Sequence, residues 1–179
     1  TILVTSIILV IATTGTVEAQ VEVTSDVTFS VFHDNLMDYG RWVDNPDYGQ
    51  VWIPFEQGFV PYRTNGYWAY TEDGWTWVSD YDWGWAPFHY GRWGYDDNYG
   101  EYFWVPGYDW GPAWVSWRRN NDVYGWAPLS PNMNIGIGVS FGSEIPVNRW
   151  TFVSPQYIAQ RHISRYYVDS RRNVTIINN

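Results

Sequence analysis

Cysteine and lysine are both absent from this chain of 179 residues. Without cysteine the protein has no disulfide, no zinc-thiolate site and no thiol nucleophile. Charged residues are few, at 16%, whereas aromatic residues reach 21%, a balance that excludes disordered and coiled-coil proteins. Long stretches free of helix breakers are missing too, because Gly and Pro are scattered between Asp38 and Pro131. Together these absences favour a mostly β fold built around one core.

Basic residues are scarce in the first two thirds of the chain. Residues 1–117 hold 16 acidic side chains against Arg41, Arg63 and Arg92, whereas residues 118–179 hold seven arginines against three acids. Nucleic-acid affinity depends mainly on cations that neutralise the phosphate backbone, which an acidic body repels. The charge distribution therefore argues against a nucleic acid as partner.

Residues 1–19 resemble a secretory signal without its start. The apolar run 7–12 is followed by Val17 and Ala19, small residues at the −3 and −1 positions of a cleavage site before Gln20. The alternative is a membrane anchor, but the apolar run is shorter than the roughly 20 residues that a bilayer requires. We expect export to the periplasm, the outer cell surface or the extracellular space, with residues 20–38 as an N-terminal strand or lead-in.

A tryptophan motif repeats through residues 39–130. The element Gly-x-Trp ends at Trp42, Trp68 and Trp93, and a looser fourth copy ends at Trp114. Each copy is followed 9 to 12 residues later by Trp and an aliphatic residue, usually with Pro next. The copies start 21 to 26 residues apart, which suits two short strands and their turns.

Turn-forming residues separate the two halves of each repeat. They lie at 45–49, 72–74, 96–100 and 120–122, where Asn, Asp and Gly supply positive φ and side-chain hydrogen bonds to the backbone. Each repeat is therefore predicted to be a hairpin. The predicted fold is mostly β, an antiparallel meander of Trp-rich β-hairpin repeats with one short C-terminal helix.

The C-terminal residues 131–179 differ in character. Residues 134–141 alternate apolar residues with Gly or polar ones, which predicts a strand with one bare face, and a second strand is expected at 150–153. Ser154 and Pro155 are typical of a cap and a first helical position, so they predict a short helix over 155–162. Residues 174–177 predict a final strand with a free edge.

The repeat motifs also resemble a known family. The residues that carry the likeness are 39–44, 51–54, 74–80, 83–93, 110–115 and 125–129. They are similar to the bacterial domain-of-unknown-function family 6600, the aromatic YXWGXW-repeat envelope proteins, over residues 32–178. The resemblance implies an exported bacterial β-repeat protein with no assigned activity, cofactor or catalytic residue.

Metal-ligating and catalytic patterns are weak. Oxygen ligands for Ca²⁺ cluster at Asp96, Asp97, Asn98 and Glu101 without the alternating spacing of an EF-hand, so a plain acidic turn is the alternative. We predict no other cofactor, because the three histidines lack the spacing of zinc ligands.

The absence of nucleophile motifs and phosphate-binding loops predicts that the protein is not an enzyme. Asp80 and Asp82 lie beside tryptophans and imitate the carboxylate pair of a glycoside hydrolase, which is the remaining enzymatic alternative.

Two kinds of interaction surface are candidates instead. Flat rings with flanking Asp, Asn and Arg suit sugars, because a few polar groups orient an otherwise apolar contact. The candidate glycan platform consists of Trp75, Trp77, Trp83, Trp85, Tyr81 and Tyr99.

The arginine-rich tail is the second surface. Its guanidinium groups and its final strand are expected to meet the acidic body of a neighbouring copy and form head-to-tail assemblies, including filaments. The alternative is a tail that folds back on its own body. The candidate self-association residues are Arg161, Arg165, Arg171, Arg172, Val174 and Ile176.

We interpret the chain as a non-enzymatic exported structural protein of the bacterial cell envelope or extracellular matrix that associates with itself. A module that binds a cell-envelope or extracellular glycan is the first alternative, and a polysaccharide hydrolase is the second.

Overall fold

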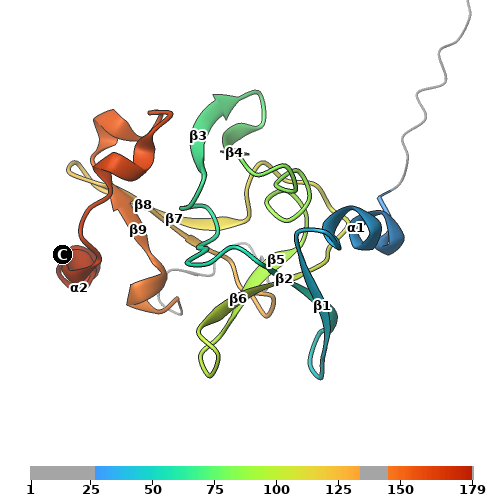
Figure 1. Ribbon diagram of the computed structural model, residues 1–179. Coiled ribbons are helices and arrows are strands. Elements are labelled where there is room, and N and C mark those ends of the chain that lie inside the picture. Colours follow the sequence, from blue (N-terminus) through green and yellow to red (C-terminus); the bar gives the residue numbers. More distant parts are fainter. Residues whose placement is uncertain (1–26, 134–144, 179) are drawn as a thin grey trace, which may run out of the picture.

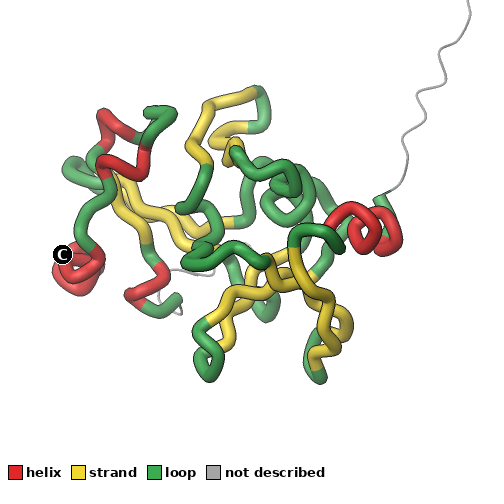
Figure 2. Tube along the Cα trace, viewed as in Figure 1, coloured by secondary structure: helices red, strands yellow, loops and turns green. Residues whose placement is uncertain are grey.

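The computed structural model describes residues 27–133 and 145–178 (Figure 1). Figure 2 shows that strands and loops dominate and that the helices are short and lie near the two ends of the chain. The strands are β1 (Gly40–Asn45), β2 (Gly49–Pro54), β3 (Gly66–Thr71), β4 (Gly74–Ser79), β5 (Arg92–Asp96), β6 (Glu101–Val105), β7 (Val115–Arg119), β8 (Tyr124–Pro128) and β9 (Thr151–Val153). The helices are α1 (Phe29–Leu36) and α2 (Asn173–Asn178), and short 3-10 turns are η2 (Val147–Arg149), η3 (Pro155–Tyr157), η4 (Ile163–Tyr166) and η5 (Ser170–Arg172).

The predicted hairpins are confirmed, and each one is centred on a pair of facing tryptophans. The strand pairs β1–β2, β3–β4, β5–β6 and β7–β8 are all antiparallel. The facing pairs are Trp42 with Trp52, Trp68 with Trp77, Trp93 with Trp104 and Trp117 with Trp126.

The fourth repeat begins at a different tryptophan from the expected one. Trp117, and not Trp114, faces Trp126 across the hairpin. Trp114 lies outside the strands, where its indole Nε1 donates to the His89 carbonyl at 3.0 Å. The looser Gly-x-x-Trp spacing was the sign that Trp114 has a separate role.

The turns form as their side chains predict. Asn45 Oδ1 accepts hydrogen bonds from the next backbone amides, at Asp47 and Tyr48, and Asn120 Oδ1 does the same in the fourth hairpin. Such turns are favoured locally because the side chain replaces a backbone acceptor. Each hairpin is therefore encoded within its own repeat.

The repeat glycines are explained by the tryptophan of the second strand. A Cβ built on Gly40 would lie 2.4 Å from the Trp52 ring and 2.4 Å from the Ile53 carbonyl oxygen. On Gly66 it would lie 2.6 Å from the Trp77 ring. Because real Cβ atoms do not approach other atoms so closely, only glycine lets the indole lie flat on the neighbouring strand.

The hairpins assemble into three separate sheets. The first and third hairpins combine in the order β1-β2-β6-β5, β3 and β4 stand as a pair, and β9 joins the fourth hairpin in the order β7-β8-β9. Seven of the eight facing tryptophans form or pack on one aromatic core that also contains the fully buried Tyr62, whereas Trp117 is exposed. A second, smaller cluster forms around Trp150 and Phe152. The Tyr62 hydroxyl donates to the Phe88 carbonyl and accepts from the Trp114 amide.

Helix α1 lies within residues 20–38, where an N-terminal strand or lead-in was expected. In α1, Phe32 and Leu36 are fully buried. Residues four apart share one face of a helix, whereas a strand would place the exposed Asp34 on that same face between them. Residues 1–19, the expected signal segment, and the expected strand 134–141 lie outside the described residues.

Two predictions for the C-terminal region are wrong. The helix expected at 155–162 is only the 3-10 turn η3, because Ile158 is the one buried residue of this range and a single buried side chain gives a helix no apolar face to pack on the core. Residues 174–177 are helical, not extended. Ile176 and Ile177 both pack on the second cluster, whereas a strand would point them in opposite directions.

No helix within the described parts of the chain is long and apolar enough to cross a membrane.

Candidate functional site

A row of tryptophans forms one face of the four-stranded sheet. Trp52 faces Trp42 on one side and Trp104 on the other, and Trp104 faces Trp93. All but Trp42 are almost fully buried in the aromatic core. Because neighbouring side chains along a strand point to opposite faces, the residues next to these tryptophans are directed away from the core. Those beside Trp42 and Trp52, together with Phe103, line the candidate site.

The candidate site is a groove between the first and third hairpins. Strands β2 and β6 pair only at Trp52 and Trp104, and beyond that point the two hairpins diverge (Figure 1). A cavity of about 330 Å³ lies between them. The first hairpin lines it with Arg41, Val43, Asp44, Asn45, Pro46, Val51 and Ile53, and the third with Asp96, Tyr99, Glu101 and Phe103.

An ion pair bridges the groove. The Arg41 guanidinium donates to the Glu101 carboxylate at 2.5 Å, from the edge strand β1 across to β6. Both side chains remain nearly half exposed, at 46% and 40%. A ligand in the groove can therefore reach polar atoms of both residues, and their mutual contact holds them in place beforehand.

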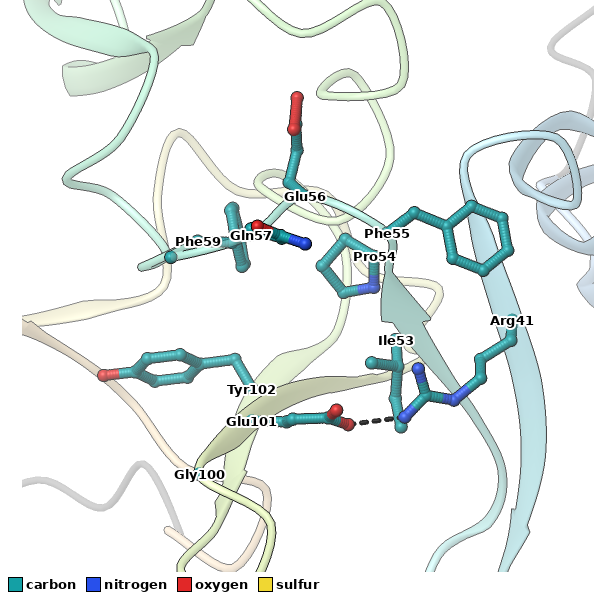
Figure 3. Close-up of a pocket in the computed structure, with 11 residues that line it drawn as sticks. Arg41, Ile53, Pro54, Phe55, Glu56, Gln57, Phe59, Gly100, Glu101 and Tyr102 are labelled. Atoms are coloured by element: carbon teal, nitrogen blue, oxygen red, sulfur yellow. Dashed lines mark hydrogen bonds and ion pairs between the residues drawn. The ribbon is translucent and has the colours of Figure 1, made fainter.

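A second cavity, of about 300 Å³, borders the same ion pair (Figure 3). It shares Arg41, Ile53 and Glu101 with the first cavity. Its remaining lining comes from the segment after β2 and from the start of β6: Pro54, Phe55, Glu56, Gln57, Gly58, Phe59, Gly100 and Tyr102.

The lining combines exposed rings with hydrogen-bonding groups. Phe55 and Tyr99 are 61% and 79% exposed, so their ring faces are available to a ligand. Gln57 offers an amide, and Glu56 and Glu101 offer carboxylates. Burial raises the pKa of Tyr102 above the ordinary value for tyrosine.

The candidate glycan platform is not one surface. Trp77 and Trp83 lie in the core, with 0% and 4% of their surface exposed, so neither ring can receive a sugar. Trp75 is partly buried, and Tyr81 is partly buried and stacked on Trp83 at 4.4 Å between ring centres. Of the six residues, Trp85 and Tyr99 are exposed, and Tyr99 alone lines the groove.

The side chains considered as Ca²⁺ ligands form hydrogen bonds or ion pairs with different residues. Asp96 Oδ1 accepts from the amides of Asn98 and Tyr99, Asp97 pairs with Arg149 at 3.0 Å, and Glu101 pairs with Arg41. Within residues 27–133 and 145–178 no three His, Cys, Asp or Glu side chains are grouped to hold a metal ion.

The tail contacts its own chain. Arg161 donates to Asp80 Oδ1 at 3.2 Å and to the Tyr67 hydroxyl at 3.1 Å. Asp80, considered above as one of a hydrolase pair with the exposed Asp82, is therefore held in an ion pair. The side chain of Asn173, which is 1% exposed, donates to the carbonyls of Val147 and Trp150 and fixes the start of α2.

The other tail residues offer no strand edge. Arg171 pairs with Asp169 two residues away, and this contact lowers the pKa of Asp169 to about 2. Arg165, Arg172 and Val174 are exposed, and Ile176 packs on the second cluster. Residues 174–177 thus form a helix that packs on its own chain in place of the predicted strand.

The sequence did not point to the groove residues Arg41, Phe55, Glu56, Gln57 and Tyr102. One signal was present: the repeat element reads Gly-Arg-Trp in the first and third repeats alone. Those are the two hairpins that pair to form the groove.

Residues 33–133, more than half of the chain, match the family described as Family of unknown function (DUF6600). The chain belongs to this family. The matched region of DUF6600 begins within α1 and includes all four hairpins and the groove. No curated protein and no solved structure matches the chain.

Proposed function

We propose that this DUF6600 protein is an exported, non-enzymatic module that binds an uncharged polysaccharide in the groove between its first and third hairpins. The observation that carries the proposal is the lining of the groove. Exposed rings at Phe55 and Tyr99 stand beside an amide, carboxylates and a guanidinium. Sugars present apolar ring faces edged by hydroxyl groups, and such a lining complements both.

The size of the cavities favours a polymer over a small free ligand. Sites that enclose a small molecule usually measure about 300–1,000 Å³. The two cavities, of about 330 and 300 Å³, lie at the lower end of that range and are joined along a groove. This geometry suits a chain whose units each lie partly in a cavity and whose ends continue outside it.

The charge of the groove favours a neutral ligand. Asp44, Glu56, Asp96 and Glu101 line it, against a single cation, Arg41. Polyanions such as polyuronates and nucleic acids would be repelled by this lining and by the net charge of −9.

Glycan binding is favoured over assembly through the tail. Three of the six residues that were expected to join copies are engaged within the chain: Arg161 with Asp80, Arg171 with Asp169, and Ile176 on the second cluster. Export is proposed from residues 1–19, and the absence of chemistry from the lack of a nucleophile motif.

Calorimetric titration of the full chain with a hexamer of N-acetylglucosamine tests the proposal. We expect binding to the wild type, and at least tenfold weaker binding after Tyr99→Ala, because one stacking ring is lost. Tyr70→Ala is the matched control, since Tyr70 is 75% exposed on the separate β3–β4 hairpin. Polygalacturonate should give no binding. Absence of binding by the wild type, or equal affinities of the two variants, would contradict the proposal.

A further inference from the structure

The groove sheet has an approximate internal twofold symmetry. Its strand order, β1-β2-β6-β5, places the second strands of the two hairpins at the centre and the first strands at the edges. The central strands are antiparallel and meet at Trp52 and Trp104. A twofold axis through that pair exchanges the first hairpin with the third, because facing residues of antiparallel strands are related in this way.

The same symmetry relates Arg41 to Arg92. Arg41 faces Ile53 in the first hairpin, and Arg92 faces Val105 in the third. Each aliphatic residue is followed by a proline, Pro54 or Pro106. The two Gly-Arg-Trp repeats therefore place a guanidinium, an aliphatic side chain and a proline in the same arrangement twice.

A cavity accompanies each copy of this arrangement. The one in Figure 3 contains Arg41, Ile53, Pro54 and Gln57. A separate cavity, of about 190 Å³, is lined by residues at the equivalent positions, Arg92, Val105, Pro106 and Asp109, together with Gly91, Gly107, Tyr108, Trp114 and Pro131. Gln57 and Asp109 each stand three residues after the proline, and both are exposed.

The Arg92 cavity offers the same chemistry as the cavity of Figure 3, but from different partners. Glu101 binds the Arg41 guanidinium in the cavity of Figure 3, whereas the Arg92 guanidinium lies over the Trp114 ring, 3.6 Å from its centre. Arg92 also donates to the Gly91 carbonyl at 2.9 Å. Tyr108, which is 58% exposed, supplies a ring, and Asp109 supplies a carboxylate. A fixed guanidinium, exposed aromatic surface and an oxygen acceptor are thus present in both places.

The other two repeats have lost this arrangement. Tyr67 and Ser116 occupy the arginine position, directly before Trp68 and Trp117. Tyr67 is moreover engaged by Arg161, which donates to its hydroxyl. The repeats with arginine are those that pair with each other, and the repeats without it stand in other sheets.

We propose that the Arg92 cavity is a second glycan subsite, equivalent to the Arg41 subsite, which is the cavity of Figure 3. One protein molecule then binds two units of the same polysaccharide. This inference rests on the proposed function of the groove. A polysaccharide repeats the same unit, so two of its segments can occupy two equivalent subsites, in opposite directions because a twofold axis relates the subsites. Engagement of both subsites by one molecule would raise the affinity for long polysaccharides over short ones.

One substitution of an exposed residue in each subsite tests the two subsites independently. Calorimetry of the full chain with the trimer of N-acetylglucosamine is expected to give two sites on the wild type. Gln57→Ala should leave only the Arg92 subsite, and Asp109→Ala only the Arg41 subsite, each lost subsite binding at least tenfold more weakly. The double variant should lose both. Glu72→Ala, an exposed change in the β3–β4 turn, is the control and should keep two sites.

The outcomes distinguish this inference from the proposed function. One site on the wild type, abolished by Gln57→Ala and unaffected by Asp109→Ala, would overturn the second subsite and leave the groove intact. Absence of binding by the wild type would overturn both. Circular dichroism of the variants checks that each remains folded, and the exposure of Gln57 and Asp109 makes this the expected result.

Discussion

The substitution Gly40→Ala tests whether the repeat glycine exists to admit a tryptophan. The new methyl group would lie 2.4 Å from both the Trp52 ring and the Ile53 carbonyl oxygen. Neither can yield easily, because Trp52 is fully buried and its Nε1 donates to the Leu36 carbonyl at 3.0 Å. Overpacking of a core costs about 1–3 kcal/mol, and loss of the indole hydrogen bond adds about 1 kcal/mol.

A small gain partly offsets this cost. Alanine lowers the conformational entropy of the unfolded chain, which stabilises the folded state by about 0.4–1 kcal/mol. We therefore expect Gly40→Ala to lower the free energy of unfolding by about 2 kcal/mol, measured by urea denaturation with circular dichroism. Gly49→Ala is the control, since Gly49 has a φ of 73° but no atom within 4 Å of the added methyl. Its expected loss is about 1 kcal/mol, from backbone strain alone. If Gly40→Ala is no more destabilising than Gly49→Ala, the explanation of the repeat is wrong.

Three further predictions concern the stability of the fold. Trp77→Ala or Trp104→Ala should each cost about 3–5 kcal/mol in urea denaturation, because both rings are fully buried; thermal unfolding like that of the wild type would refute the aromatic core. Asn173→Ala should remove two hydrogen bonds that hold α2, so hydrogen exchange in residues 173–178 should quicken while β3–β4 stays unchanged. Burial raises the pKa of Tyr62 and Tyr167 above the ordinary 10.0, so stability should hold below pH 10 and fall above it, by up to about 1.4 kcal/mol per pH unit for each tyrosine. Tyr167→Phe should make that alkaline loss shallower, and an unchanged slope would contradict the assignment.

The hairpins were predictable because their signals are local. Asn45 and Asn120 each form the turn that follows them, and the facing tryptophans lie 9 to 11 residues apart along the chain. Turn chemistry and hydrophobic spacing of this kind are set within one repeat. The only shift was in the fourth repeat, where Trp117 takes the place expected for Trp114.

The sheet order and the groove were not predictable in this way. All four repeats carry similar strand patterns, so the sequence alone does not say that β2 joins β6. The ion pair between Arg41 and Glu101 joins residues 60 positions apart and exists only after that pairing. Helix α2 was missed for a related reason: its β-branched residues favour a strand, but packing of Ile176 and Ile177 on the second cluster decides the conformation.

The most direct test of the account is to locate the glycan on the protein. Backbone amide signals of the isotope-labelled full chain, followed by NMR during titration with the hexamer of N-acetylglucosamine, report which residues the ligand reaches. We expect the largest shifts at Tyr99, Glu101 and Arg41, which line the groove, and little change at Tyr70 on the β3–β4 hairpin. Shifts centred on Tyr70 and its neighbours, or no shifts at saturating glycan, would contradict the claim that this protein binds a polysaccharide between its first and third hairpins.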